Sequence, residues 1–310
     1  MAMTRGEASA QLRSIYLAPR LGERLYGRMP TFPVAASGAV RLNRNGLTLV
    51  EEQNIGADWV RRGLYHRRQD WCDQGWRILD WALDQQEAEG GWACRDPFHS
   101  AMRYLQALTL ALLLDPQRIT RQRMRCCGRA LNWMTSRPVE RRGLRHDARY
   151  GHRQWMAACL YQCAAVLFGR PRFHARAAKH ALLAMSSQRP DGVYPELGGY
   201  DVAYQIYGSS FAQRFLMLCE DAAMVDLAEG SLRRALEWYV ARMDPRSGIV
   251  STLGSSRVSM EMGHGGHGKR VSYPRAVEVF TIAALMEGGE GFEAAALASM
   301  AAAKAKGQAA

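Results

Sequence analysis

Long apolar runs are missing from this sequence of 310 residues. The first residues, MAMTRGEASAQLRSIY, lack the continuous apolar core of a secretory signal peptide. Elsewhere no run approaches the roughly 18 apolar residues that a membrane-spanning helix requires. These absences predict a soluble, cytoplasmic protein.

A disulfide framework is also missing from the pattern. The seven cysteines are odd in number and lie mostly inside helical patterns, where reduced cysteine behaves as a small apolar residue. We therefore expect the thiols to contribute to packing. The cysteines are Cys72, Cys94, Cys126, Cys127, Cys159, Cys163 and Cys219.

Acidic residues are scarce relative to basic ones. The chain has 41 Lys and Arg against 29 Asp and Glu, a net charge of +12. This balance favours a polyanionic partner, which leaves nucleic acid, an anionic membrane surface or an acidic glycan, unless the protein is simply basic. The apolar content of 48% excludes disorder throughout and suits one large domain or two small ones.

Helical periodicity begins after residue 50. Residues 1–50 contain Pro19, Pro30, Pro33 and an extended piece at 39–50, so we interpret them as an N-terminal arm. Residues 51–306 form the predicted helical domain, and 307–310 form a tail. Apolar spacing and Gly or Pro punctuation predict helices at 57–66, 70–86, 99–115, 118–136, 153–168, 171–188, 202–219, 221–243, 275–287 and 290–306.

Short and long links alternate between these helices. Short links make neighbouring helices antiparallel, whereas the long links, at 89–98, 137–152, 189–201 and 244–274, are rich in Gly, His, Tyr and Arg. Helices that follow long links are apolar over most of their circumference, as expected for an inner layer. The pattern predicts an all-α fold, an (α/α) toroid or incomplete toroid of about five helix hairpins, with an elongated solenoid as the alternative.

In a toroid the long links meet at one end, where inner helices begin with unpaired backbone N–H groups and partial positive charge. The link 189–201 supplies Glu196, and Tyr200, Tyr204 and Tyr207 follow at helical spacing. These tyrosines either face a ligand or form a packed aromatic stripe.

Two further links carry chemically versatile side chains. Arg145, His146, Arg149, Tyr150 and His152 crowd the link before the inner helix at 153, a set able to hold a carboxylate and exchange a proton. The link at 89–98 contributes Trp92, whose ring is suited to stacking on a sugar, and leads to His99 and Arg103. Its Asp96-Pro97 pair also fits an ordinary helix start.

The glycine-rich segment at 254–270 carries Glu261, His264, His267 and Lys269. We find no third ligand there for a metal ion, and the spacing matches no phosphate-binding loop. We interpret the segment as a mobile lid, with His264 contacting the substrate, and expect neither metal nor cofactor.

Residues 151–216 resemble the helical domain of the heparinase II/III-like polysaccharide lyases. The resemblance rests on Gly151-His152 opening an inner helix that ends at Leu167-Phe168, an outer helix to Gln188, and then Asp191-Gly192, Glu196, Tyr200-Asp201 and Tyr204. It implies an α/α toroid, Tyr200 as the proton-transferring tyrosine, and His152 near the substrate carboxylate. Two positions depart from the family's pattern, where Gly151 replaces Asn and Asp201 replaces His.

The expected function is therefore that of a carbohydrate-active enzyme on an acidic, uronate-containing polysaccharide or oligosaccharide, in preference to nucleic acid or a membrane. A lyase that acts by β-elimination needs a neutralised carboxylate, a base and an acid, and tyrosine serves when cations such as Arg103, Arg145 and Arg149 lower its pKa. One alternative is a uronyl C5-epimerase, because Gly90-Gly91-Trp92 and the segment that begins at His99 faintly resemble the helical domain of these enzymes. The other alternative is a non-catalytic polyanion-binding protein. A hydrolase would use two carboxylic acids from among Asp96, Glu196 and Asp201.

Overall fold

The structure is a computed structural model, and it describes residues 3–27, 33–41, 48–94, 96–262, 268–288 and 290–308. These residues contain thirteen α-helices and two 3-10 helices. They also contain isolated β-bridges, but no strand. The helices are α1 (Arg5–Tyr16), α2 (Pro19–Leu25), α3 (Gly56–His66), α4 (Gln69–Asp84), α5 (Pro97–Leu114), α6 (Arg121–Met134), α7 (Arg137–Asp147), α8 (Gly151–Phe168), α9 (Pro171–Ser187), α10 (Val202–Leu216), α11 (Ala222–Val240), α12 (Tyr273–Glu287) and α13 (Glu290–Ala305). The 3-10 helices are η1 (Val50–Ile55) and η2 (Pro116–Arg118).

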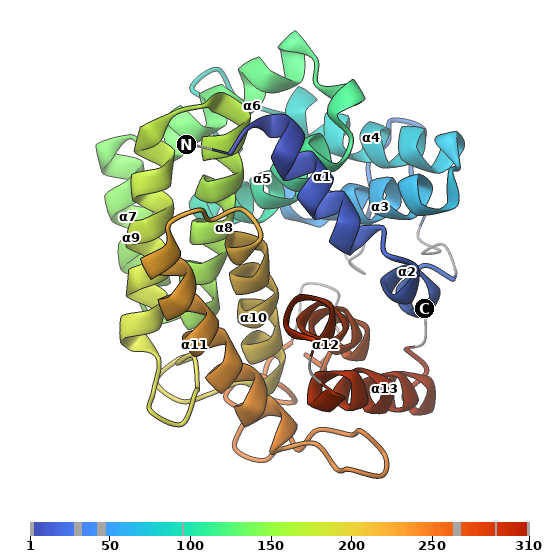
Figure 1. Ribbon diagram of the computed structural model, residues 1–310. Coiled ribbons are helices and arrows are strands. Elements are labelled where there is room, and N and C mark those ends of the chain that lie inside the picture. Colours follow the sequence, from blue (N-terminus) through green and yellow to red (C-terminus); the bar gives the residue numbers. More distant parts are fainter. Residues whose placement is uncertain are drawn as a thin grey trace.

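All ten expected helices are present, with ends within three residues of the predicted ones. Five hairpins, α3/α4, α5/α6, α8/α9, α10/α11 and α12/α13, follow one another around a ring (Figure 1). The first helix of each hairpin packs against the next first helix, so α3, α5, α8, α10 and α12 form the inner layer. In α8 every residue from Gly151 to Leu167 is buried, as expected for a helix enclosed by neighbours on all sides.

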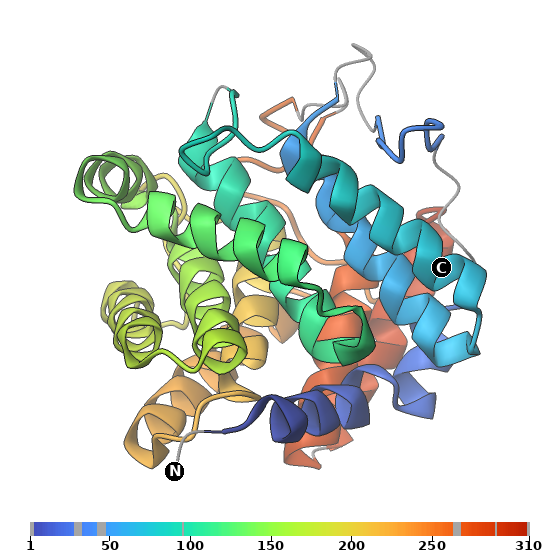
Figure 2. The ribbon, with the colours of Figure 1, turned by 90° about the horizontal axis from the view of Figure 1, so that it is seen from above.

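The N-terminal segment differs from the expected arm because it contains α1 and α2. Helix α1 buries Ala8, Leu12 and Tyr16 completely, a stripe with a spacing of four residues along one face. Arg13 Nη1 donates to the carbonyl of Leu114, the last residue of α5, at 2.7 Å. Helix α1 therefore lies against the C-terminal end of the inner layer, and Figure 2 shows it as the dark-blue helix along one side.

Helix α2 occupies the position between α12 and α3 and so closes the ring (Figure 1). Its Gly22 lies directly beside the ring of Tyr65 in α3, where an added Cβ would meet the tyrosine at 2.0 Å. Pro19 is the first residue of α2, where its missing N–H costs no hydrogen bond, so this proline starts a helix rather than breaking one. Of the expected extended piece at 39–50, residues 42–47 lie outside the described residues, and Val50 begins η1.

The link at 137–152 also differs from the expected solvated turn, because most of it is α7. Pro138 lies in the first turn of this helix, and Gly143 packs directly against the ring of Phe98 in α5. The remaining residues are largely charged, so the segment has only a narrow apolar stripe. That narrow stripe explains why periodicity does not reveal the helix.

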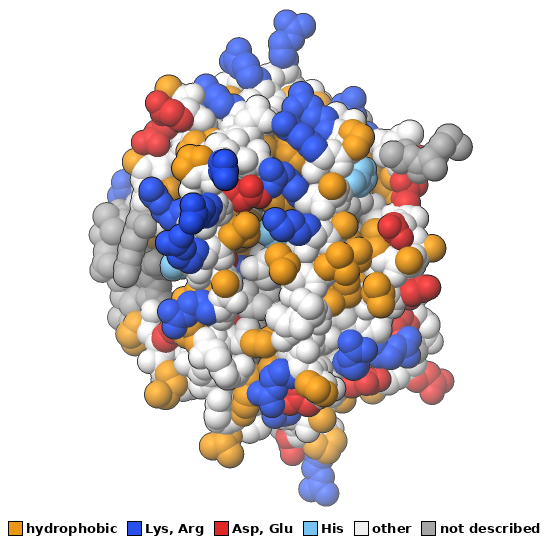
Figure 3. Space-filling model, turned by 90° about the vertical axis from the view of Figure 1, so that its left-hand side faces the viewer, with side chains coloured by type: hydrophobic (Ala, Val, Ile, Leu, Met, Phe, Trp, Pro, Cys, Tyr) orange, Lys and Arg blue, Asp and Glu red, His pale blue; other side chains and the backbone are white. Residues whose placement is uncertain are grey.

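Positive charge is visible on the outer surface as well. On the face that includes α7 and α9, Lys and Arg side chains gather over the upper half of the molecule as drawn (Figure 3). Among the described residues, no helix combines the length and apolar content that crossing a membrane requires.

His180 of α9 gives a stability prediction. Its side chain is 1% exposed, its Nδ1 lies 2.9 Å from Gln154 Oε1, and burial, with Lys179 and Arg176 nearby, lowers its pKa to about 4. Between about pH 4 and pH 6.5, His180 binds a proton in the unfolded chain but not in the folded one. The free energy of unfolding therefore rises as the pH increases over this range. Replacing His180 with Gln should reduce this slope by up to about 1.4 kcal/mol per pH unit.

The measurement is urea unfolding at pH 5.0, 5.5, 6.0 and 7.0 for wild type and His180→Gln, analysed at a common m value. Parallel stability curves for the two proteins over this range would contradict the assignment.

Candidate active site at the N-terminal ends of the inner helices

A cavity of about 1100 Å³ lies where the inner helices begin. Its wall includes the opening residues of all five inner helices: Asp58 of α3, His99 of α5, His152 of α8, Tyr204 of α10 and Arg275 of α12. This confirms the prediction that the polar segments converge, because the antiparallel hairpins bring every inner N-terminus to the same end.

The cavity wall is cationic. Within the described residues it contains eight Lys and Arg side chains, namely Arg61, Arg103, Arg142, Arg153, Arg214, Arg257, Lys269 and Arg275. Five carboxylates share the wall, namely Glu51, Glu52, Asp58, Asp96 and Glu261. The formal excess on the wall itself is three positive charges, which favours an anionic ligand. Asp147, Glu196 and Glu278 lie behind the wall and pair with some of these cations.

One wall of the cavity carries a carboxylate-oriented histidine. His152 Nδ1 lies 2.8 Å from Glu196 Oε2, and Arg257 Nη1 donates to Glu196 Oε1 at 2.5 Å. Burial alone would raise the pKa of Glu196, but His152 and Arg257 outweigh that effect and hold it below its usual value. The ionised Glu196 accepts a hydrogen bond from His152 Nδ1, so Nε2 is the ring nitrogen that is available for proton transfer.

The backbone keeps the two halves of this pair together. Gly151 donates its N–H to the carbonyl of Pro195 at 2.8 Å, and Tyr150 forms a β-bridge with Glu196. An added Cβ on Gly151 would come within 2.9 Å of the Pro195 carbonyl oxygen. The absence of Asn at position 151 is therefore explained by this close approach between two links.

Tyr204 lies beside the histidine. Its ring centroid is 4.4 Å from that of His152, with Arg257 Cζ 4.1 Å and Lys269 Nζ 5.2 Å from the tyrosine ring. The residue belongs to the first turn of α10, where the N-cap Asp201 accepts the N–H of Tyr204 at 3.1 Å. We call His152, Glu196, Tyr204, Arg257 and Lys269 the mouth cluster.

Asp201 also positions Arg257. Its Oδ2 accepts the backbone N–H groups of Arg257 and Val258 at 2.8 and 2.7 Å, and the hydroxyl of Ser255 at 2.8 Å. One carboxylate thus caps α10 and binds the segment after Gly254. Arg257 was not predicted as a site residue, because its position in the site depends on this long-range contact with Asp201.

Tyr200 does not line the cavity. Its hydroxyl donates to the carbonyl of Leu253, and its ring packs edge-on against Trp238 of α11, with centroids 5.2 Å apart. Tyr200 precedes the N-cap of α10, and its side chain packs against α11, whereas Tyr204 faces the cavity. The role of proton-transferring tyrosine expected for Tyr200 therefore has no geometrical basis.

Of the other predicted site residues, some line the cavity and some do not. His99 and Arg103 line the cavity, and burial, with Arg153 and Arg103 nearby, lowers the pKa of His99 well below its usual value. Trp92 is 2% exposed and donates its Nε1–H to the carbonyl of Ala82 at 2.7 Å, so its expected stacking on a sugar is wrong.

Arg145, in the last turn of α7, and Arg149, in the link after that helix, are exposed and lie outside the cavity wall. They therefore cannot lower a tyrosine pKa in the cavity as expected. His264 lies outside the described residues.

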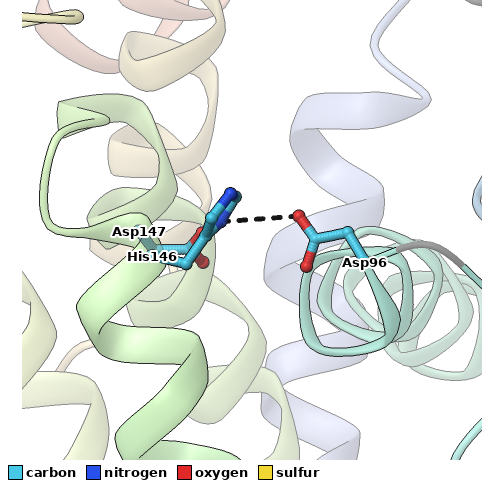
Figure 4. A group of neighbouring side chains, drawn as sticks. All are labelled: Asp96, His146 and Asp147. Atoms are coloured by element: carbon cyan, nitrogen blue, oxygen red, sulfur yellow. Dashed lines mark hydrogen bonds and ion pairs between the residues drawn. The ribbon is translucent and has the colours of Figure 1, made fainter.

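Asp96, His146 and Asp147 form the one group among the described residues whose ligand atoms are close enough for a metal ion, all within 4.8 Å of one another (Figure 4). The guanidinium of Arg153 already contacts this group, with Nη1 at 3.5 Å from Asp96 Oδ2 and 3.2 Å from His146 Nδ1, and an ion pair to Asp147. Arg153 thus supplies the positive charge that the carboxylates require, and we assign the group to an ion-pair cluster. Asp96 additionally accepts the N–H of His99 as the N-cap of α5.

Comparison with known structures identifies the architecture. The protein is similar to a glycosyl hydrolase family 88 protein from Bacteroides vulgatus, with a TM-score of 0.61, 8% identity, and coverage of 96% of this chain and 84% of that one. The chain has the α/α toroid fold. A type II terpene cyclase from Scytonema also matches the toroid, with a TM-score of 0.49, 17% identity, and coverage of 94% and 79%. No protein-family model and no curated protein matches the sequence.

Removing the carboxylate of Glu196 should destabilise the toroid. Glu196 is 1% exposed and pairs with both His152 and Arg257, so Glu196→Gln leaves a buried guanidinium with less compensation. We expect a loss of about 3 kcal/mol in the free energy of unfolding, measured by urea denaturation. Asp191→Asn is the matched control, because its exposed pair with Arg189 should contribute less than about 1 kcal/mol. Equal effects of the two substitutions would contradict this assignment.

Proposed function

We propose that the protein is a carbohydrate-active enzyme that binds an acidic, uronate-containing polysaccharide or oligosaccharide in this cavity. The observation that carries the proposal is the packing of Tyr204 against His152 in the cavity wall, with Arg257 and Lys269 over the tyrosine ring. Cations on the wall suit a sugar carboxylate, and the two rings supply groups that transfer protons. The similar Bacteroides vulgatus protein is a glycosyl hydrolase, which is consistent with a carbohydrate ligand.

The reaction we propose is β-elimination. Arg257 and Lys269, which both pair with Glu261 in the free protein, also neutralise the uronate carboxylate, and this makes the proton on the adjacent carbon, C5, more acidic. His152 Nε2 takes that proton, the electron pair forms the C4–C5 double bond, and the C4–O bond breaks. The Tyr204 hydroxyl gives its proton to the departing oxygen. Glu196 holds the His152 ring through Nδ1 and stabilises its protonated form.

The competing reactions keep fewer of their predicted residues in the cavity. Of the carboxylates considered for hydrolysis, only Asp96 lines the cavity, whereas Glu196 and Asp201 are 1% exposed and engaged in hydrogen bonds. Epimerisation at C5 shares the first proton transfer with elimination and differs in where the proton returns. The epimerase-like segment around Trp92 is buried, which weakens that resemblance.

The experiment incubates the protein with a panel of uronate polymers and follows three signals. Elimination produces a conjugated double bond, which absorbs ultraviolet light, together with new reducing ends. New reducing ends without absorbance would show hydrolysis, and solvent deuterium at C5 without either signal would show epimerisation. Salt-sensitive binding of these polymers without any chemical signal would show a polyanion-binding protein and would contradict catalysis.

Tyr204→Phe should reduce kcat by roughly 10²- to 10⁴-fold, because it removes the proton donated to the leaving oxygen. The affinity for substrate should change little, since the ring and its neighbouring cations remain. Tyr200→Phe is the matched control, because Tyr200 lies four residues before Tyr204 and donates its hydroxyl to the Leu253 carbonyl outside the cavity, and it should retain nearly full activity. The opposite pattern, with loss only in Tyr200→Phe, would contradict the assignment of Tyr204. The readout is initial velocity against substrate concentration for both variants.

A further inference from the structure

A second group of cations lies deeper in the cavity. Arg61 of α3, Arg214 of α10 and Arg275 of α12 surround Glu278 of α12. Arg61 Nη1 donates to Glu278 Oε1 at 2.9 Å, Arg275 Nη1 to Oε2 at 2.7 Å, and Arg214 Nη2 to Oε1 at 3.4 Å. We call these four residues the floor cluster.

The floor cluster lies at depth in the cavity and is closed from below. Arg61, Arg214 and Glu278 are each 4% exposed. Arg214 follows Tyr204 by ten residues on α10, a rise of about 15 Å along the helix. Tyr16 of α1 supports it, with a hydroxyl that accepts from Arg214 Nε at 2.8 Å and a ring 5.1 Å from Arg61 Cζ.

The three arginines of the floor cluster line the cavity, whereas Glu278 is not part of its wall. Their contacts include two carboxylates, because Arg61 also pairs with Asp58. Three positive charges therefore face two negative ones, a formal excess of one. Arg61 Nε is buried and has no hydrogen-bond partner among the described residues. The net charge favours an additional anionic group at this place, and the buried Nε is a donor that the ion pairs of the cluster leave unsatisfied.

Tyrosine rings on α10 connect the floor cluster to the mouth cluster. Arg275 Cζ lies 5.5 Å from the ring centroid of Tyr207, and that ring lies 6.0 Å from Tyr204. Tyr204 in turn contacts Arg257, so cations stand at both ends of an aromatic pair. A ligand lying along these rings would meet one cationic group at each end.

We propose that the floor cluster is a second anion-binding subsite, which takes one carboxylate or similar oxyanion while the mouth cluster takes another. The inference rests on the proposed function and narrows the substrate to glycans with acidic groups on neighbouring sugar residues. Arg275 is the substrate-facing member, because its guanidinium is more exposed than those of Arg61 and Arg214.

The experiment compares two saturated uronate disaccharides by isothermal titration calorimetry at constant ionic strength. One carries both carboxylates, and the other has one carboxylate replaced by a neutral carboxamide. Wild type should bind the diacid at least about ten-fold more tightly. Arg275→Gln should reduce this ratio to near one, whereas Arg270→Gln, an exposed residue outside the cavity wall, should preserve it.

Tyr16→Phe provides a second variant that leaves every charge in place. It removes the acceptor of Arg214 Nε and should lower the diacid preference without abolishing binding of the monoacid. Thermal unfolding of each variant in the absence of ligand checks that the fold is retained.

The outcomes separate the two proposals. Equal affinity for both disaccharides in wild type, or a preference that Arg275→Gln leaves intact, overturns the floor subsite and leaves the proposed function standing. If neither disaccharide binds, the glycan proposal fails. The floor subsite is then tested by measuring whether inorganic sulfate raises the thermal unfolding temperature of the protein. Stabilisation by sulfate that disappears in Arg275→Gln but persists in Arg270→Gln supports the subsite, and any other sulfate result overturns it.

Discussion

Closure of the inner ring of helices is the constraint on which the rest of the structure depends. Helices that are enclosed on every side have little surface left for polar side chains, so these residues gather at the N-terminal ends or, as in the floor cluster, are buried in ion pairs. The antiparallel hairpins then bring all the inner N-termini to one end of the ring. The cavity and its charged wall follow from this arrangement rather than from any single motif.

Charge pairing makes the displaced polar groups rigid. A buried arginine or carboxylate is costly unless it is paired and hydrogen-bonded, and Glu196 and Glu278 each satisfy more than one cationic side chain. The histidine and arginines that face the cavity are therefore held in place before any ligand arrives. Such preorganisation reduces the ordering that binding or catalysis would otherwise require.

The helices that could be predicted from the sequence are those with a broad apolar face or clear punctuation at both ends. Helix α7 was not predicted because its apolar contacts are few, and α1 was not predicted because its narrow stripe lies next to prolines that suggested an irregular arm. Both errors concern helices with narrow apolar faces: α7 packs against α5, α6 and α8, and α1 packs mainly against α5. A narrow apolar face gives only a weak periodic signal in the sequence.

The sequence predicted which links between helices form the site, but it did not predict which side chains of those links face the cavity. His152, His99, Arg103 and Tyr204 line the cavity as expected from their places at inner helix starts. Spacing alone did not distinguish Tyr200 from Tyr204, since the N-cap between them reverses which one faces the cavity. Arg61, Arg214 and Arg275 lie within helical patterns, where only the three-dimensional contact with Glu278 reveals their role.

The most direct test of this account is a crystal structure of the Tyr204→Phe protein bound to a short uronate oligosaccharide. We predict sugar density inside the cavity, with one carboxylate within hydrogen-bonding distance of Arg257 or Lys269 and a ring beside His152 Nε2. An oligosaccharide bound on the outer surface, with the cavity empty, would contradict it.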